Sequence, residues 1–206
     1  MPLIKARSHD ADDDPVAPDT AGPADADTLL AAATASERRA AVHALEDSVD
    51  GQAALCRRLA IEPSASVREA ILAALIRQRS PAIAAALLPL LRAEEAPLRN
   101  AAIEALAEMP DEVAPHVEAL LADPDSDVRI FAGNMLGVLP HPRAAGWLLT
   151  ALADEHVNVC AAAIDGLAEI GDPATAAALE AVPARFPGNS FIDFAVRVAV
   201  RRIGGC

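Results

Sequence analysis

The side chains that could bind a metal are spread along the chain rather than clustered. The five histidines include no pair at helical i, i+4 spacing, and no cysteine flanks them; they are His9, His43, His116, His141 and His156. A zinc site needs three or four such ligands close together. The pattern therefore predicts no metal site.

Nucleophiles and phosphate-binding loops also lack their usual settings. No serine lies in a Gly-x-Ser-x-Gly turn, and the glycines do not cluster as a phosphate loop requires. The three cysteines, Cys56, Cys160 and Cys206, are too widely spaced for a C-x-x-C motif. We interpret Cys160 as a small buried hydrophobe. We expect no catalytic residue and no cofactor, and we predict that the protein is not an enzyme.

The bulk charge and the scarcity of aromatic residues narrow the class of partner. The 206 residues include 17 basic and 30 acidic side chains, a formal net charge of −13, and no Tyr. Phosphate backbones and anionic lipids are bound through Lys and Arg, and single-stranded nucleic acids through aromatic stacking. We therefore expect a protein partner, no nucleic acid and no membrane. Without an apolar run of about 18 residues or a signal sequence, we expect a cytoplasmic protein.

The first 26 residues differ in composition from the rest. They are rich in Asp and interrupted by Pro15, Pro18 and Pro23, so they offer little apolar surface to bury. We interpret residues 1–26 as a disordered acidic tail and residues 27–206 as the folded domain. Leu3 and Ile4 leave open whether this tail has a docking role.

The remainder of the chain repeats one unit six times. Segments 37–45, 67–75, 98–106, 128–136, 159–167 and 192–200 align without gaps, with starts 30 to 33 residues apart. Apolar residues recur at the fifth and ninth positions of each segment, which is helical spacing. This period predicts an all-α, right-handed α-α superhelix of about six helical pairs, including incomplete ends.

Two helices fit into each period. The predicted first helices span 36–46, 65–78, 96–108, 126–138, 157–169 and 190–203, and the second helices span 52–60, 81–92, 111–122, 142–153 and 173–184. Pro89 should kink the second of these because it lacks a backbone donor. Caps are predicted at Ser66, Ser80, Asp172 and Ser190.

The repeated motif carries a family resemblance. Val67-Arg68-Glu69-Ala70, Leu98-Arg99-Asn100-Ala101 and Asp127-Val128-Arg129, each followed by a Leu at equal spacing, resemble the HEAT-like repeats first associated with phycobilisome lyases. The resemblance covers about residues 28–204. It implies a HEAT/ARM-type solenoid in which the second-position arginines and a preceding acid tie adjacent repeats together. These structural arginines are Arg38, Arg68, Arg99 and Arg129.

The residues that carry the activity of one enzyme with this fold are absent from this chain. Deoxyhypusine hydroxylase, an enzyme of this fold, uses His-Glu pairs for its di-iron centre, whereas this chain has only Glu155-His156, in reverse order.

The arginine position holds Cys160 and Asp193 in the last two repeats. We therefore expect these repeats to stack by apolar contact alone, with Phe186, Phe191 and Phe194 plugging the end.

The third, seventh and eleventh positions of the repeats share the helix face opposite the core, which predicts a groove. We propose its central part as a protein-binding site, formed by Asn100, Glu104, Glu108, Ile130, Phe131, Asn134, Val138, Asp165 and Glu169. A basic amphipathic segment would match its acids and apolar step. The acids could instead be a solvated face. Phe131 is either an anchor or a filler of space beside Gly133 and Gly137.

These features favour a non-catalytic protein-binding scaffold or adaptor, acting as a regulatory or assembly factor for another protein. The alternative is a lyase-like subunit that handles a chromophore or cofactor, or an oxidoreductase-associated subunit. Metal content or absorbance of the purified chain would separate these readings.

Overall fold

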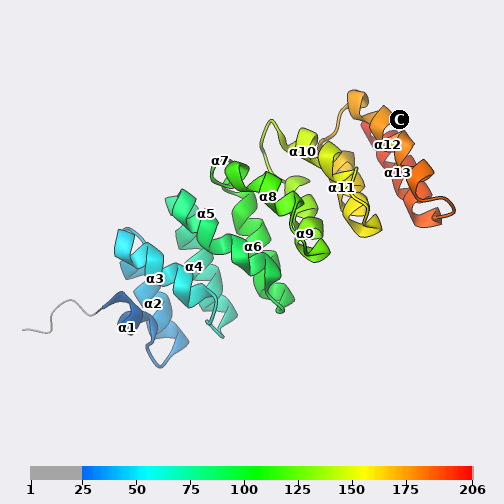
Figure 1. Ribbon diagram of the computed structural model, residues 1–206. Coiled ribbons are helices and arrows are strands. Elements are labelled where there is room, and N and C mark those ends of the chain that lie inside the picture. The colour runs from blue at the N-terminus through cyan, green and yellow to red at the C-terminus, as the bar shows by residue number, and fades with distance from the viewer. Residues whose placement is uncertain (1–24, 206) are drawn as a thin grey trace, which may run out of the picture.

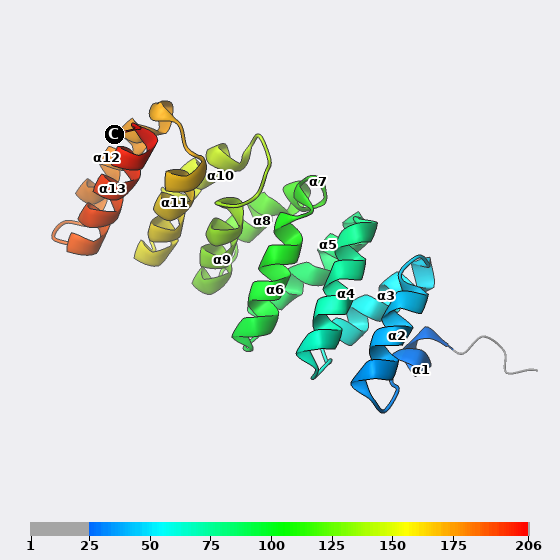
Figure 2. The ribbon, with the colours of Figure 1, turned by 180° about the vertical axis from the view of Figure 1, so that it is seen from behind.

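The six predicted first helices lie side by side as one layer of an extended row in a computed structural model (Figures 1 and 2) that describes residues 25–205. The two ends of this described region lie at opposite ends of the row. The layer consists of α2 (Ala35–Leu45), α4 (Ala65–Gln78), α6 (Ala96–Ala107), α9 (Ser126–Leu136), α11 (Val157–Ile170) and α13 (Ser190–Ile203). Each agrees with its predicted range to within two residues, so the all-α superhelix is confirmed.

The second layer is more broken than the sequence predicts. It consists of α3 (Val49–Leu59), α5 (Pro81–Leu87), α7 (Pro110–Val113), α8 (Val117–Leu121), α10 (Ala144–Ala151) and α12 (Ala176–Ala181), and the short α1 (Ala26–Leu30) packs on α2 and α3. The 3₁₀ turns Leu88–Arg92, Ala114–His116 and Val182–Arg185 interrupt or end three of these units.

Proline explains these interruptions. Pro89, Pro115 and Pro183 each occupy the second position of one of the 3₁₀ turns. A proline has no N–H to donate, and its ring crowds the preceding turn. At Pro89 the helix changes from α to 3₁₀ geometry, and the continuous helices predicted over 111–122 and 173–184 are wrong.

Polar side chains begin several helices, although not always the predicted ones. The backbone N–H of Ile83 donates to the Ser80 hydroxyl, and Asp172 accepts from two backbone N–H groups, as predicted. Asn189, rather than Ser190, caps α13. The N-cap of α4 is Ser64 rather than Ser66, and its side chain accepts no capping hydrogen bond.

The core lies between the two layers. The ninth-position side chains Leu75, Leu106, Leu136 and Leu167 are fully buried, and the fifth-position Ile71 and Ala132 are buried beside them. Burying one such leucine stabilises the fold by roughly 1.5–3 kcal/mol. This shared apolar spine turns the opposite face of every first helix, which carries the predicted groove positions, away from the core.

The helices α9 and α11 approach each other through small residues. A Cβ added to Gly137 would lie 2.9 Å from the Cα of Gly166, and one added to Gly133 would lie 3.1 Å from the Cβ of Ala162. These pairs show that the sixth and tenth repeat positions face the fourth and eighth positions of the next repeat. No side chain can be inserted at Gly137 unless the two backbones move apart.

Gly137→Ala should therefore lower the free energy of unfolding by about 1–3 kcal/mol, since overpacking forces the helices to shift. Gly146→Ala is the matched control, because nothing lies within 4 Å of the Cβ that it would add to α10. The control should raise stability by up to about 1 kcal/mol through helix propensity. Urea unfolding followed by circular dichroism would measure both; equal effects would contradict the close contact.

The predicted acidic tail, residues 1–26, lies outside the described residues except for its last two, of which Ala26 begins α1. Within residues 25–205, no helix combines the length and apolar character needed to cross a membrane.

Candidate protein-binding groove

The predicted groove positions lie mostly exposed along the first-helix layer. Of the nine proposed binding residues, Ile130 and Phe131 are half-buried, and seven are exposed: Asn100, Glu104, Glu108, Asn134, Val138, Asp165 and Glu169. They come from α6, α9, α11 and the residues directly after α6 and α9. The shared apolar spine therefore brings these side chains to one face of the row.

Exposed apolar side chains flank the acids of this groove. Val138 follows α9 and is 63% exposed, while Phe194 and Val198 on α13 are 59% and 47% exposed. Phe194 and Val198 occupy the third and seventh repeat positions, which is the signal in the sequence that places them here. The groove thus alternates between apolar and acidic surface from α9 to α13.

This exposure corrects the prediction that three phenylalanines plug the end of the array. Phe186 is half-buried against the core, but Phe191 and Phe194 are both more than half exposed. The sixth and tenth positions of α13, which would face a further repeat, are Arg197 and Arg201, and both are exposed. On this side of α13, the described residues therefore present the charged Arg197 and Arg201 rather than packed aromatic rings.

The acids in the groove are not equivalent. The pKa of Asp165 is raised because its surroundings are partly desolvated and because Glu169 lies one helical turn away. Glu169 itself pairs with Arg202 of α13. Among the described residues, Glu104 and Glu108 form no ion pair. A cation bound beside Asp165 would relieve the repulsion between these carboxylates.

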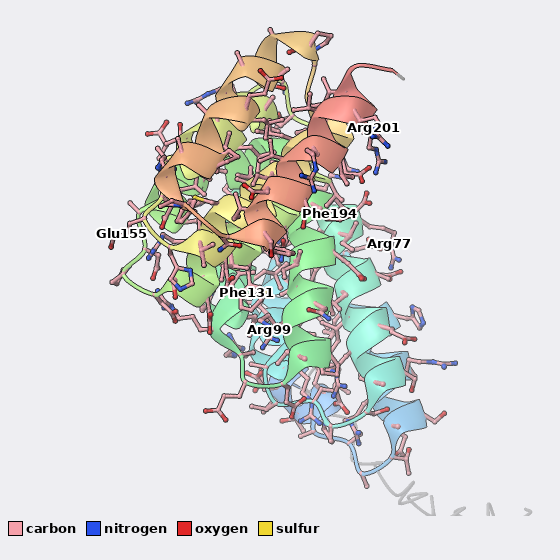
Figure 3. The ribbon with its side chains drawn as sticks, turned by 90° about the vertical axis from the view of Figure 1, so that its right-hand side faces the viewer. Arg77, Arg99, Phe131, Glu155, Phe194 and Arg201 are labelled. Atoms are coloured by element: carbon pink, nitrogen blue, oxygen red, sulfur yellow. The ribbon has the colours of Figure 1, made fainter. Side chains whose placement is uncertain are left out.

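Phe131 contacts Arg99 of the preceding repeat. The guanidinium carbon of Arg99 lies 4.6 Å from the centre of the Phe131 ring, a cation–π distance (Figure 3). The space beside Gly133 and Gly137 is filled by α11, so of the two alternatives for Phe131 the one in which it fills that space does not hold. One face of its ring is covered by Arg99, which leaves Phe131 at the edge of the groove.

The four structural arginines share one local contact. Each donates from Nη1 to the carbonyl oxygen six residues earlier, at 3.0 Å for Arg38, 2.8 Å for Arg68, 2.7 Å for Arg99 and 2.8 Å for Arg129. These carbonyls belong to the loop before each first helix. The arginines therefore fasten that loop to the helix it precedes.

Only two of these arginines also form the predicted ion pair with an adjacent repeat. Arg38 pairs with Glu62 at 2.8 Å, and Arg129 pairs with Asp154 at 2.7 Å. Arg68 has no such partner because Ala93 replaces the acid. For Arg99, the corresponding acid is Asp123, which pairs with Arg92 instead. Among residues 25–205 the predicted ion pair between repeats is thus wrong for Arg68 and Arg99, although Arg99 contacts the next repeat through the Phe131 ring.

Where Cys160 replaces the arginine, the carbonyl oxygen six residues earlier still accepts a hydrogen bond, now from the thiol. The Cys160 thiol donates to the Asp154 carbonyl at 3.0 Å, and Arg185, in the 3₁₀ turn Val182–Arg185 that follows α12, donates to the carbonyls of Ala153 and Asp154. Arg202 of the last repeat also pairs with Glu169. The prediction that the last two repeats stack by apolar contact alone is therefore wrong.

The surroundings of Glu62 and Cys160 shift the pKa values of both side chains. Burial alone would raise the pKa of Glu62, but hydrogen bonds from Arg38, the Ser64 N–H and Arg58 lower it to about 2. Burial raises the pKa of the Cys160 thiol, which keeps it protonated. Within residues 25–205, no three His, Cys, Asp or Glu side chains lie where they could hold a metal ion together.

Comparison with known proteins bears on the repeats. Residues 113–184 match the family model for HEAT repeats. A search of curated proteins gave no match. Two engineered proteins of known structure are similar: one at 17% identity and TM-score 0.40, covering 87% of this chain and 95% of its own, the other at 16% identity and 0.41, covering 88% and 98%.

A third similar structure is the complex of CpcE and CpcF of phycocyanin lyase from a Nostoc species. It is 20% identical, with a TM-score of 0.34, and the match covers 98% of this chain and 99% of that one. All three TM-scores lie below 0.5, so these likenesses carry no argument about function.

Proposed function

We propose that this chain, whose residues 113–184 match the family model for HEAT repeats, acts as a non-catalytic scaffold that binds a protein partner in the groove of its first helices. The observation that carries the proposal is the continuous exposed stripe from α6 to α13, in which acids alternate with apolar side chains. Solenoids commonly bind partners through such extended surfaces.

The chemistry of the groove favours a basic amphipathic segment as the partner. Glu104, Glu108 and Asp165 offer carboxylates without an ion-pair partner among the described residues, while Val138 and Phe194 offer apolar contacts on either side of α11. Lys or Arg on one side of a helix would meet the acids. Apolar residues spaced three or four apart would cover the exposed Val and Phe.

Glu104→Lys with Glu108→Lys should weaken binding of such a segment about tenfold or more, because attraction becomes repulsion at two positions. A synthetic amphipathic Lys/Leu helix is the probe, and fluorescence anisotropy measures its dissociation constant. The melting temperature should not fall, since both glutamates are exposed.

The matched control carries the same change in net charge outside the groove stripe. Glu94→Lys with Glu180→Lys reverses two exposed acids that make no ion pair among residues 25–205. The control should bind the probe within about threefold of the wild type. Equal losses in the two variants would indicate a bulk-charge effect and remove the groove from the proposal. The same pair of variants, compared in affinity purification from cell extract, would identify the natural partner by its selective loss.

A further inference from the structure

The open side of α13 differs from the same side of every internal first helix. In α4, α6, α9 and α11 the sixth repeat position is Leu72, Ile103, Gly133 or Ile164, and it faces the next repeat. In α13 this position is Arg197, and the tenth position is Arg201. Both arginines are exposed, so no helix of residues 25–205 stacks there.

An apolar strip lies beside these arginines. Phe191, Phe194 and Val198 are 57%, 59% and 47% exposed. Figure 3 shows Phe194 and Arg201 on α13. A surface hollow of about 350 Å³ is lined by Phe194, Val198 and the three arginines Arg197, Arg201 and Arg202. Exposed apolar side chains rimmed by charged residues often mark an interaction site.

The charges of this face select an acidic occupant. Arg202 pairs with Glu169, but neither Arg197 nor Arg201 forms an ion pair among residues 25–205. Pairing α13 with α13 of a second copy would bring like charges together. A segment that combines carboxylates with an apolar side chain would satisfy both the arginines and the strip.

We propose that this face binds residues 10–16 of a second copy of the chain, so that molecules associate head to tail. This segment, Asp-Ala-Asp-Asp-Asp-Pro-Val, lies outside the described residues and combines four carboxylates with Val16. Its acids are complementary to Arg197 and Arg201, and Val16 is an apolar group for the strip beside Phe194. Asp25, where the described part of the chain begins, and the α13 face lie at opposite ends of each molecule.

The length of the chain favours a second copy over the molecule's own tail. Asp14 precedes Asp25 by eleven residues, which span at most about 40 Å when fully extended. Asp25 directly precedes α1, at the other end of the row from α13 (Figure 1). Five helix spacings of about 8–10 Å separate α2 from α13, or about 40–50 Å in all. Asp13, Asp14 and Val16 therefore reach α13 of another molecule more readily than their own.

Sedimentation velocity of the full chain at low ionic strength tests this association. The wild-type sedimentation coefficient should rise with protein concentration, and added salt should reverse the rise. Arg197→Glu with Arg201→Glu should weaken association about tenfold or more, and so should Asp12→Lys with Asp13→Lys. Phe194→Ser should also weaken it. Circular dichroism checks that each variant remains folded.

A mixture of the two charge variants distinguishes head-to-tail binding from other arrangements. Each variant keeps one intact half of the contact, and the two reversed halves are opposite in charge, so an equimolar mixture should associate although neither variant does so alone. A wild type that stays monomeric, tail variants that associate like the wild type, or a mixture that stays monomeric would each overturn the proposal.

This contact shares Phe194 and Val198 with the groove, but it depends on Arg197 and Arg201, which the groove partner does not use, so the two proposals can fail independently. Glu104→Lys with Glu108→Lys should leave the sedimentation behaviour unchanged. Arg197→Glu with Arg201→Glu should leave binding of the Lys/Leu probe within about threefold of the wild type. A loss of self-association together with retained probe binding would therefore concern only the α13 face.

Discussion

Glu62→Gln should lower the free energy of unfolding at neutral pH by about 3–5 kcal/mol, the usual cost of breaking a buried ion pair by removing one partner. Glu62 is 3% exposed and accepts hydrogen bonds from Arg38, Arg58 and the Ser64 N–H. The variant leaves the buried Arg38 without its counter-charge. Urea unfolding followed by circular dichroism gives the difference.

The exposed pair between Arg57 and Asp27 provides the control. Both side chains are more than half exposed, so Asp27→Asn should cost no more than about 1 kcal/mol. If Glu62→Gln proved as mild as Asp27→Asn, the buried cluster would not stabilise the first two repeats.

The same substitution should also change how stability depends on pH. The folded-state pKa of Glu62 is about 2, below its ordinary value of 4.5. A lowered pKa means that the carboxylate stabilises the fold above about pH 4.5 and that this contribution is lost as the pH falls toward 2. The difference between wild type and Glu62→Gln should therefore shrink over this interval. A difference independent of pH would contradict the assignment.

Leu106→Ala should lower the free energy of unfolding by about 2–5 kcal/mol because it leaves a cavity in the spine between the helix layers. Leu106 is fully buried at the ninth position of its repeat. Leu136→Ala should act similarly, since Leu136 has the same position and burial. Thermal and urea unfolding measure both losses.

Val138→Ala is the matched control for these losses. Val138 is 63% exposed in the groove, so its truncation should change stability by less than about 0.5 kcal/mol. It should instead weaken binding of the amphipathic probe. A large loss of stability for Val138→Ala would mean that the groove side chains are structural.

The first helices could be predicted closely because one period fixes both their apolar side and their ends. The second layer could not, because a short apolar helix tolerates a proline by changing to a 3₁₀ turn, as at Pro115 and Pro183. Proline marks the position of such a change, but the sequence alone does not show whether the helix resumes beyond it.

The contacts between repeats were harder to predict than the helices. The family resemblance implied that Arg129 ties adjacent repeats together, and the pair of Arg129 with Asp154 does so. It could not reveal that Asp123 is taken by Arg92, or that Arg185 reaches the carbonyls beside Cys160 from a different helix. Which partner a long side chain reaches depends on the three-dimensional position of its charged end. The repeat pattern does not encode that position.

The groove positions followed from periodicity, whereas the role of Phe131 did not. A large residue at an otherwise small position suggested an anchor, but the ring lies under Arg99 of the preceding repeat. The absence of Cβ atoms at Gly133 and Gly137 lets α9 approach α11 closely. One side of α9 therefore packs on α6 through Phe131, and the other side packs on α11 through the two glycines.

The contact of Gly137 with Gly166 has a mechanical consequence for recognition. Two backbones in direct van der Waals contact leave no flexible side chains between them that could rearrange, so we expect α9 and α11 to move as one rigid block. The separation of Val138 from Asp165 is then set before any ligand arrives. A peptide whose cationic and apolar groups match that fixed interval would lose little entropy on binding, while one of a different interval could not be accommodated by adjustment of the protein.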